Sequence, residues 1–132
     1  MDVPRMYLGG GGTWLEMVHT EGEDWRVTAS WYSSLTADFT AFLTVEEVAE
    51  FADGMVARLS VPTGDRFSAR VTPGRNNPLT LTAEPVGERF AFFAWLTPNG
   101  DDEVCHLQME INPADATELA DGFAALRAAL AG

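Results

Sequence analysis

The chain has 132 residues, a length that predicts one domain with a substantial core and no second domain of ordinary size. Its 20 acidic and 8 basic residues give a net charge of −12, and every basic residue is an arginine because the sequence contains no lysine. Phosphate backbones repel such an acidic chain, which excludes nucleic acid as a direct ligand.

The beginning of the sequence bears on the compartment. Residues 1–8 include Asp2, Pro4 and Arg5 and contain no apolar stretch of the length that a signal peptide or a membrane span requires. The single cysteine, Cys105, excludes an intramolecular disulfide and a CxxC motif. We therefore expect a cytoplasmic protein with no membrane contact, no metal and no other cofactor.

The first third of the chain alternates apolar and polar residues with the period of two that is typical of strands. After a short apolar start at 6–8, the glycines at 9–12 predict a flexible loop, because the Gly-Lys-Ser/Thr sequence of a phosphate-binding loop does not follow. Strands are expected at 13–19, 25–32 and 39–43, and the turn at 21–24 joins the first two as a hairpin.

A helix over 45–59 has the clearest start signal in the sequence. Thr44 is the expected N-cap, Glu47 follows three residues later, and apolar residues then recur with helical spacing. Pro62 and Gly64 are expected to end the helix.

The second half predicts four more strands and a closing helix. The strands are centred on 67–71, 79–83, 90–96 and 104–111, and residues 98–102 predict a hairpin loop with an Asn-Gly pair. Asn112 as N-cap, Pro113 at the first helical position and Asp115 at the third predict a helix over 113–130.

The two predicted helices resemble each other at a constant offset of 68 residues, at which Glu50–Gly54 matches Glu118–Gly122. The match predicts two β-β-β-α units, at about 1–60 and 61–132, within one domain of residues 1–132; chance similarity between alanine-rich helices is the alternative. The repeated glycines at 54 and 122 suggest close packing against a neighbour, with two merely tolerated glycines as the alternative.

Taken together, these elements predict an α+β fold. We expect a strongly twisted, mainly antiparallel sheet of six to eight strands, with both helices packed on one of its faces.

Catalytic and metal-binding patterns are weak. Cys105 and His106 would point to opposite faces of a strand, so a structural histidine and a buried free cysteine are favoured over a metal site. No Gly-x-Ser-x-Gly elbow is present, and Glu46, Glu47 and Glu50 are expected on the solvent side of their helix. The sequence therefore predicts a protein that is not an enzyme.

Two features favour a partner-binding surface. Each of two predicted hairpin turns carries three carboxylates, and the strand 90–96 is apolar on both faces, so that sheet curvature, a loop, a dimer mate or a partner protein must cover the second face. The residues that we predict to bind a partner are Glu21, Glu23, Asp24, Trp31, Phe93, Trp95, Asp101, Asp102 and Glu103.

The order of elements, the tryptophan-bearing strands, the Phe39-x-Ala41-x-Leu43 strand that enters a capped helix and the closing Asn112-Pro113 helix resemble small actinobacterial proteins of unknown function. More distantly, they resemble the WapI-type immunity proteins of polymorphic toxin systems. The resemblance implies a cytoplasmic, non-catalytic protein that binds and neutralises a cognate toxin. It transfers no functional residue to a position of this sequence.

Three functions remain open at this stage. The first is an acidic, immunity- or inhibitor-like protein that binds a basic protein, as a monomer or a homodimer. The second is a small-molecule-binding protein or enzyme with a pocket between sheet and helices, near Trp31, Trp95 and His106. The third is an acidic chaperone for a secreted protein.

Overall fold

The structure is a computed structural model that describes residues 3–60, 65–98, 100 and 104–131. It confirms the α+β class, with eight strands and two helices. In chain order the elements are β1 (Arg5–Gly10), β2 (Thr13–Glu21), β3 (Asp24–Trp31), β4 (Leu35–Phe42), α1 (Val45–Leu59), β5 (Phe67–Arg70), β6 (Leu79–Val86), β7 (Arg89–Leu96), β8 (Leu107–Asp115) and α2 (Ala116–Ala131).

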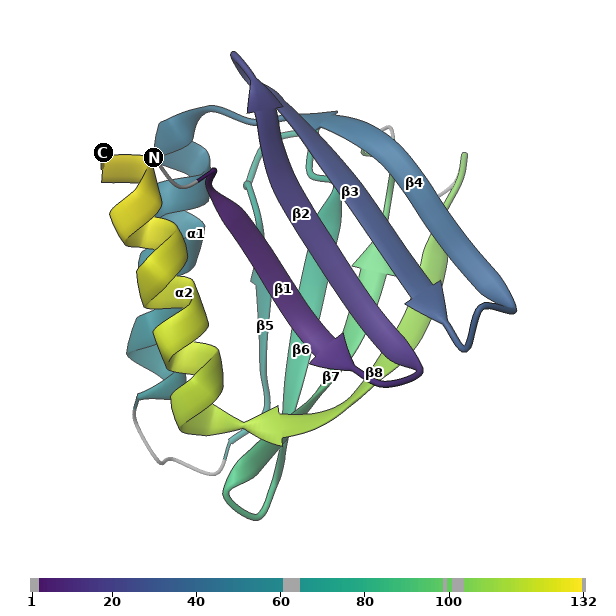
Figure 1. Ribbon diagram of the computed structural model, residues 1–132, viewed down its shortest axis with the longest axis vertical. Coiled ribbons are helices and arrows are strands. Elements are labelled where there is room, and N and C mark those ends of the chain that lie inside the picture. Colours follow the sequence, from purple (N-terminus) through teal and green to yellow (C-terminus); the bar gives the residue numbers. More distant parts are fainter. Residues whose placement is uncertain (1–2, 61–64, 99, 101–103, 132) are drawn as a thin grey trace.

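The strands form two four-stranded antiparallel sheets where we expected one. The N-terminal sheet has the order β1-β2-β3-β4 and the C-terminal sheet the order β5-β6-β7-β8, with the first sheet in front of the second in Figure 1. Each strand pairs only with its neighbours in sequence, and α1 interrupts the series after β4. Each sheet is thus a meander of four strands followed by a helix. The predicted repeat unit had three strands, although four were expected in the second half.

The first strand was not predicted, because its glycines resemble a loop in the sequence. Gly9 and Gly10 belong to β1 and pair with Trp14 and Thr13 of β2, which leaves a tight turn at Gly11 and Gly12. Glycine is required at position 9, where φ is +95° and a Cβ would collide with the carbonyl oxygen of Thr13. The expected flexible loop is therefore a hairpin.

The core lies between the two sheets and extends under the helices. The fully buried side chains include Leu15, Met17 and Trp25 from the first sheet and Leu81 and Phe92 from the second. The indole Nε1 of Trp25 donates a hydrogen bond of 3.2 Å to the carbonyl oxygen of Leu43, so this buried polar group is satisfied.

The helices lie side by side on the same side of the molecule, away from β4 (Figure 1). Phe51 of α1 meets Phe123 of α2 edge to face, with 5.7 Å between ring centroids. Helix α1 contacts β5, and α2 contacts β1 and β8, so each helix closes an edge of a sheet. Within the described residues, neither helix has the length and apolarity that a membrane span needs.

Helix α1 has the predicted bounds, and its capping box is confirmed. The Thr44 hydroxyl accepts from the backbone N–H of Glu47 (3.1 Å), and the Glu47 carboxylate accepts from the backbone N–H of Thr44 (2.9 Å). This backbone hydrogen bond from Thr44, followed by one from the Thr72 side chain, lowers the pKa of Glu47 below its ordinary value of 4.5.

The predicted start of the second helix is wrong by three residues. Asn112 and Pro113 belong to β8, and the carboxylate of Asp115 caps α2 by accepting from the backbone N–H groups of Thr117 (2.8 Å) and Glu118 (3.2 Å). Tertiary contacts extend the strand, since the Asn112 N–H donates to the buried Thr13 hydroxyl (3.1 Å).

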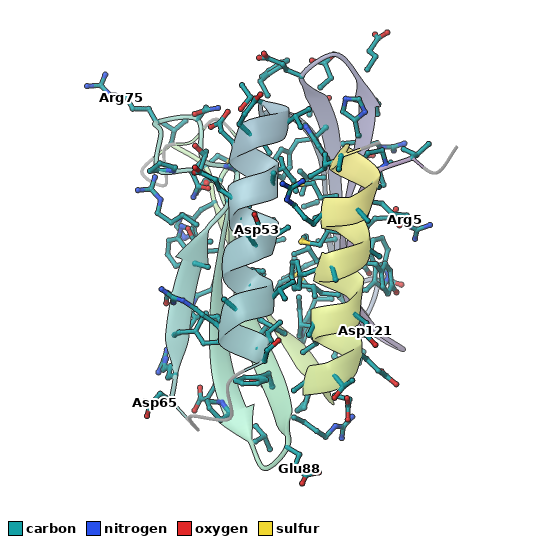
Figure 2. All side chains as sticks on the ribbon, turned by 90° about the vertical axis from the view of Figure 1, so that its left-hand side faces the viewer. Arg5, Asp53, Asp65, Arg75, Glu88 and Asp121 are labelled. Atoms are coloured by element: carbon teal, nitrogen blue, oxygen red, sulfur yellow. The ribbon has the colours of Figure 1, made fainter. Side chains whose placement is uncertain are left out.

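The expected close packing at the repeated helix glycines is also wrong. A Cβ built at Gly54 or at Gly122 meets no atom within 4 Å. Figure 2 shows the helices side by side, with Asp53 and Asp121, the residues before these glycines, on exposed helix surface. The glycines are therefore tolerated without a packing reason.

Candidate functional site

The predicted carboxylates of the β2–β3 turn lie on the surface. Glu21 and Glu23 are exposed and Asp24 is half-buried, and Gly22 turns the chain with a φ of +54°. The three ion pairs among the described residues join Arg5 to Glu16, Arg26 to Asp38 and Arg127 to Asp53. The acidic turn takes part in none of them, so its charge is not neutralised locally.

The predicted Trp31 lies in an exposed aromatic turn at the end of β3. The rings of Trp31 and Tyr32 meet edge to face at 5.1 Å, and 39% of Trp31, 54% of Tyr32 and 53% of Leu35 are exposed. Tyr32 and Ser33 both have positive φ values, +52° and +61°, which side chains rarely adopt. This strained turn holds several large apolar side chains in solvent.

Strand β4 runs alongside β3 from the aromatic turn back to the acidic turn. In the register between β3 and β4, Asp24 pairs with Phe42 and Trp31 pairs with Leu35. The two predicted groups therefore lie at opposite ends of β4, about 23 Å apart at the rise of a strand. Phe42 is itself 59% exposed, so an apolar side chain accompanies the carboxylates.

A groove of about 350 Å³ runs beside β4, on the side of the molecule away from the helices. Its walls come from the first half of β4 and from the segments on either side of the β7–β8 connection. The lining residues are Leu35, Thr36, Ala37, Asp38, Phe39, Leu96, Pro98, Cys105, His106 and Leu107. Most of these are apolar, and Asp38, Cys105 and His106 are the three with ionisable side chains.

The predicted Phe93 and Trp95 lie elsewhere, on the outer face of the C-terminal sheet. Both are half-buried, while Phe92, Ala94 and Leu96 of the same strand point into the core. Trp95 stacks on His106 with 4.4 Å between centroids and 7° between planes, so the chain itself covers part of this face. Because His106 also lines the groove, Trp95 borders the β4 region, whereas Phe93 faces Thr82 and Glu110.

The predicted residues Asp101, Asp102 and Glu103 lie outside the described part of the chain. Sequence reasoning missed Leu35, Thr36 and Asp38, because only residues 39–43 of this segment were expected to form a strand. The available signal was the alternation that begins at Leu35, four residues before the expected strand.

The histidines and the cysteine of the described chain belong to no metal-binding cluster. No cluster of three or more His, Cys, Asp or Glu side chains with metal-binding geometry occurs within residues 3–60, 65–98, 100 and 104–131. The Nε2 atom of His19 lies 2.7 Å from the Gly22 carbonyl oxygen, and its ring packs edge-on against Trp25. Cys105 is exposed, which corrects the expectation of a buried thiol; it precedes β8 and lines the groove.

The hollows beside the helices do not contain the residues named for the small-molecule alternative. One of about 210 Å³ lies between α2 and β1, and one of about 340 Å³ lies between α1 and β5. Neither is lined by Trp31, Trp95 or His106, and the space between the two sheets is core.

Comparison of the chain with protein-family models, with curated protein sequences and with solved structures finds no match.

Proposed function

We propose that this chain is a non-enzymatic, acidic protein-binding module of the immunity or inhibitor kind, which binds and neutralises a basic protein in the cytoplasm. The observation that carries the proposal is the exposed acidic turn of Glu21, Glu23 and Asp24, which has no ion pair among the described residues and adjoins the exposed Phe42. Carboxylates beside exposed apolar surface are suited to a partner with basic groups around an apolar centre.

The overall charge supports the same partner. A chain with a net charge of −12 attracts a basic protein over several ångströms and raises its association rate, an effect that salt weakens. Three of the arginines are already ion-paired, and Arg58, Arg70 and Arg89 donate to backbone carbonyls within the chain. The carboxylates dominate the field that a partner meets because they outnumber the arginines by 12.

The experiment is affinity capture from the host lysate at about 0.05 M and about 0.3 M salt, followed by association kinetics with the purified partner. Association should slow in the double variant Glu21→Lys, Glu23→Lys. The matched control is Glu88→Lys, Asp121→Lys, which changes the net charge equally at exposed positions outside the acidic turn (Figure 2). If association slows equally in both variants, the acidic turn is not part of the binding site.

A small-molecule-binding function is the second candidate, because the groove beside β4 has the volume of a small ligand site, about 350 Å³. A metabolite screen by thermal shift tests it. A ligand that raises the unfolding temperature, and fails to do so when Leu107→Arg fills the groove, would favour this function.

A further inference from the structure

The edge of β4 that faces away from β3 has a backbone with unused hydrogen-bonding groups. Hydrogen-bonded pairs alternate with non-bonded pairs along an antiparallel ladder. Leu43 donates its N–H to the Glu23 carbonyl oxygen (2.9 Å), one position beyond the Asp24–Phe42 pair, which sets the phase of the ladder. It follows that Leu35, Ala37, Phe39 and Ala41 direct their backbone groups to β3, and Thr36, Asp38, Thr40 and Phe42 direct theirs outward.

An independent contact agrees with this phase. The carbonyl oxygen of Phe42 accepts a hydrogen bond of 2.6 Å from the side-chain amide of Asn76, which reaches it from the outer edge. For Thr36, Asp38 and Thr40, the described residues provide no partner for the outward N–H and C=O groups. Three consecutive outward positions are therefore free to pair with another strand.

The other edge strands of the two sheets have cover. Strand β1 contacts α2, the four-residue β5 contacts α1, and β8 contacts β1 and β2. Strand β8 also contains Pro113, and its register with β7 shifts between Phe90 and Phe92. Proline, bulges and covering elements are the devices that keep sheet edges from pairing with other chains.

Strand β4 lacks these devices. Its eight residues pair with β3 in unbroken register, and it contains no proline and no basic residue. Its one charged side chain, Asp38, is tied back to β3 by two hydrogen bonds from the Arg26 guanidinium, of 3.0 and 2.6 Å. In the described chain β4 is the last strand of its sheet and pairs with β3 alone.

We propose that the free edge of β4 accepts an extended segment of the basic partner as a fifth strand of the N-terminal sheet. Side chains at every second position of that segment would lie over the apolar groove, beside Ala37, Phe39 and Leu107. That the bound segment is basic rests on the proposed function. That a strand can pair at this edge rests on the backbone geometry alone.

Charge complementarity selects a basic segment over a second copy of this chain. The acidic turn lies at the Phe42 end of the free edge, and Arg26, which pairs with Thr40 in the ladder, is already ion-paired with Asp38. A second copy would bring another net charge of −12 to the same edge. A segment that alternates apolar and basic residues would fill the groove and also reach the carboxylates.

The test uses the synthetic peptide acetyl-(Arg-Val)₄-amide with the whole protein and follows backbone amide hydrogen exchange by NMR. In the free protein the amides of Thr36, Asp38 and Thr40 should exchange fast, and those of Ala37 and Phe39 slowly. Bound peptide should slow the first set by about tenfold or more and leave the second set unchanged. Acetyl-Arg₄-Val₄-amide controls for composition and acetyl-(Glu-Val)₄-amide for charge, and both should bind about tenfold more weakly.

Proline variants test the edge directly. Thr36→Pro and Thr40→Pro each remove an outward N–H without removing a hydrogen bond to β3, so the sheet should persist. Peptide affinity should fall about tenfold in either variant. Thr36→Val and Thr40→Val keep the N–H and the side-chain shape, and they should bind like the wild type. If a proline variant fails to fold, the exchange pattern of the wild-type protein still decides.

Several outcomes would overturn the proposal. One is a bound peptide that protects amides elsewhere, and another is no binding at about 1 mM peptide. A third is slow exchange of Thr36, Asp38 and Thr40 in a free protein that light scattering shows to be a dimer, which would make a second copy the occupant. A captured basic partner that binds the proline variants as tightly as the wild type would overturn strand addition and leave the proposed function intact. If the peptide pairs with β4 but no basic partner is captured, strand addition at the edge would stand and the proposed function would be contradicted.

Discussion

Replacement of the two interior helix glycines by alanine should stabilise the protein. Glycine in the middle of a helix costs about 1 kcal/mol relative to alanine. A methyl group at Gly54 or Gly122 meets no atom within 4 Å, so no steric penalty reduces this gain. Both positions are exposed, so burial adds nothing either. We expect about 0.8–1 kcal/mol for each substitution and about twice that for the pair, if the two sites act independently.

The assay is urea denaturation followed by circular dichroism, in which the midpoint should rise without a change of slope. For a chain of this length, 1 kcal/mol corresponds to about 3–4 °C in the unfolding temperature. Gly9→Ala is the opposing control and should destabilise, because Gly9 has a φ of +95° and its Cβ would meet the Thr13 carbonyl oxygen. Destabilisation by Gly54→Ala or Gly122→Ala would refute the reasoning and show that these helix surfaces are packed.

Four further predictions follow, three from single contacts and one from the exposure of Cys105. Thr44→Ala should lower the free energy of unfolding by about 0.5–2 kcal/mol in urea titrations, since it removes one half of the capping box. The pKa of Glu47 in the folded protein lies below its ordinary value of 4.5. The ionised carboxylate therefore stabilises the fold fully above that value, and this stabilisation is lost as the pH falls through the folded pKa. Glu47→Gln should flatten the acid side of the profile of unfolding free energy against pH. Trp25→Phe should cost about 1–3 kcal/mol in the same titrations, because the buried Leu43 carbonyl loses its 3.2 Å donor. Cys105 should react with one equivalent of Ellman's reagent without denaturant, and a reaction that requires unfolding would contradict its exposure.

Part of the candidate site could be predicted from the sequence, because its signals are local. Three carboxylates around Gly22 identify an acidic turn, and an alternating strand that ends at Trp31 identifies an aromatic one. Strand β4, which lies beside both turns, was found only over 39–43, and nothing in its residues distinguishes an edge strand from a central one. Edge status depends on whether a distant segment pairs with the strand, which a short window of sequence does not contain.

The sequence by itself determined the elements whose cause lies within a few residues. The α+β class and the bounds of α1 follow from apolar periodicity and from the capping box of Thr44 and Glu47. The tertiary structure decided where distant segments meet: the division of eight strands into two sheets, the extension of β8 to Asp115, the open space at Gly54 and Gly122, and the free edge of β4. Hydrogen bonds such as that from Asn112 to Thr13 join residues far apart in the chain, and these contacts override local start signals because they satisfy buried polar groups that a local signal does not reach.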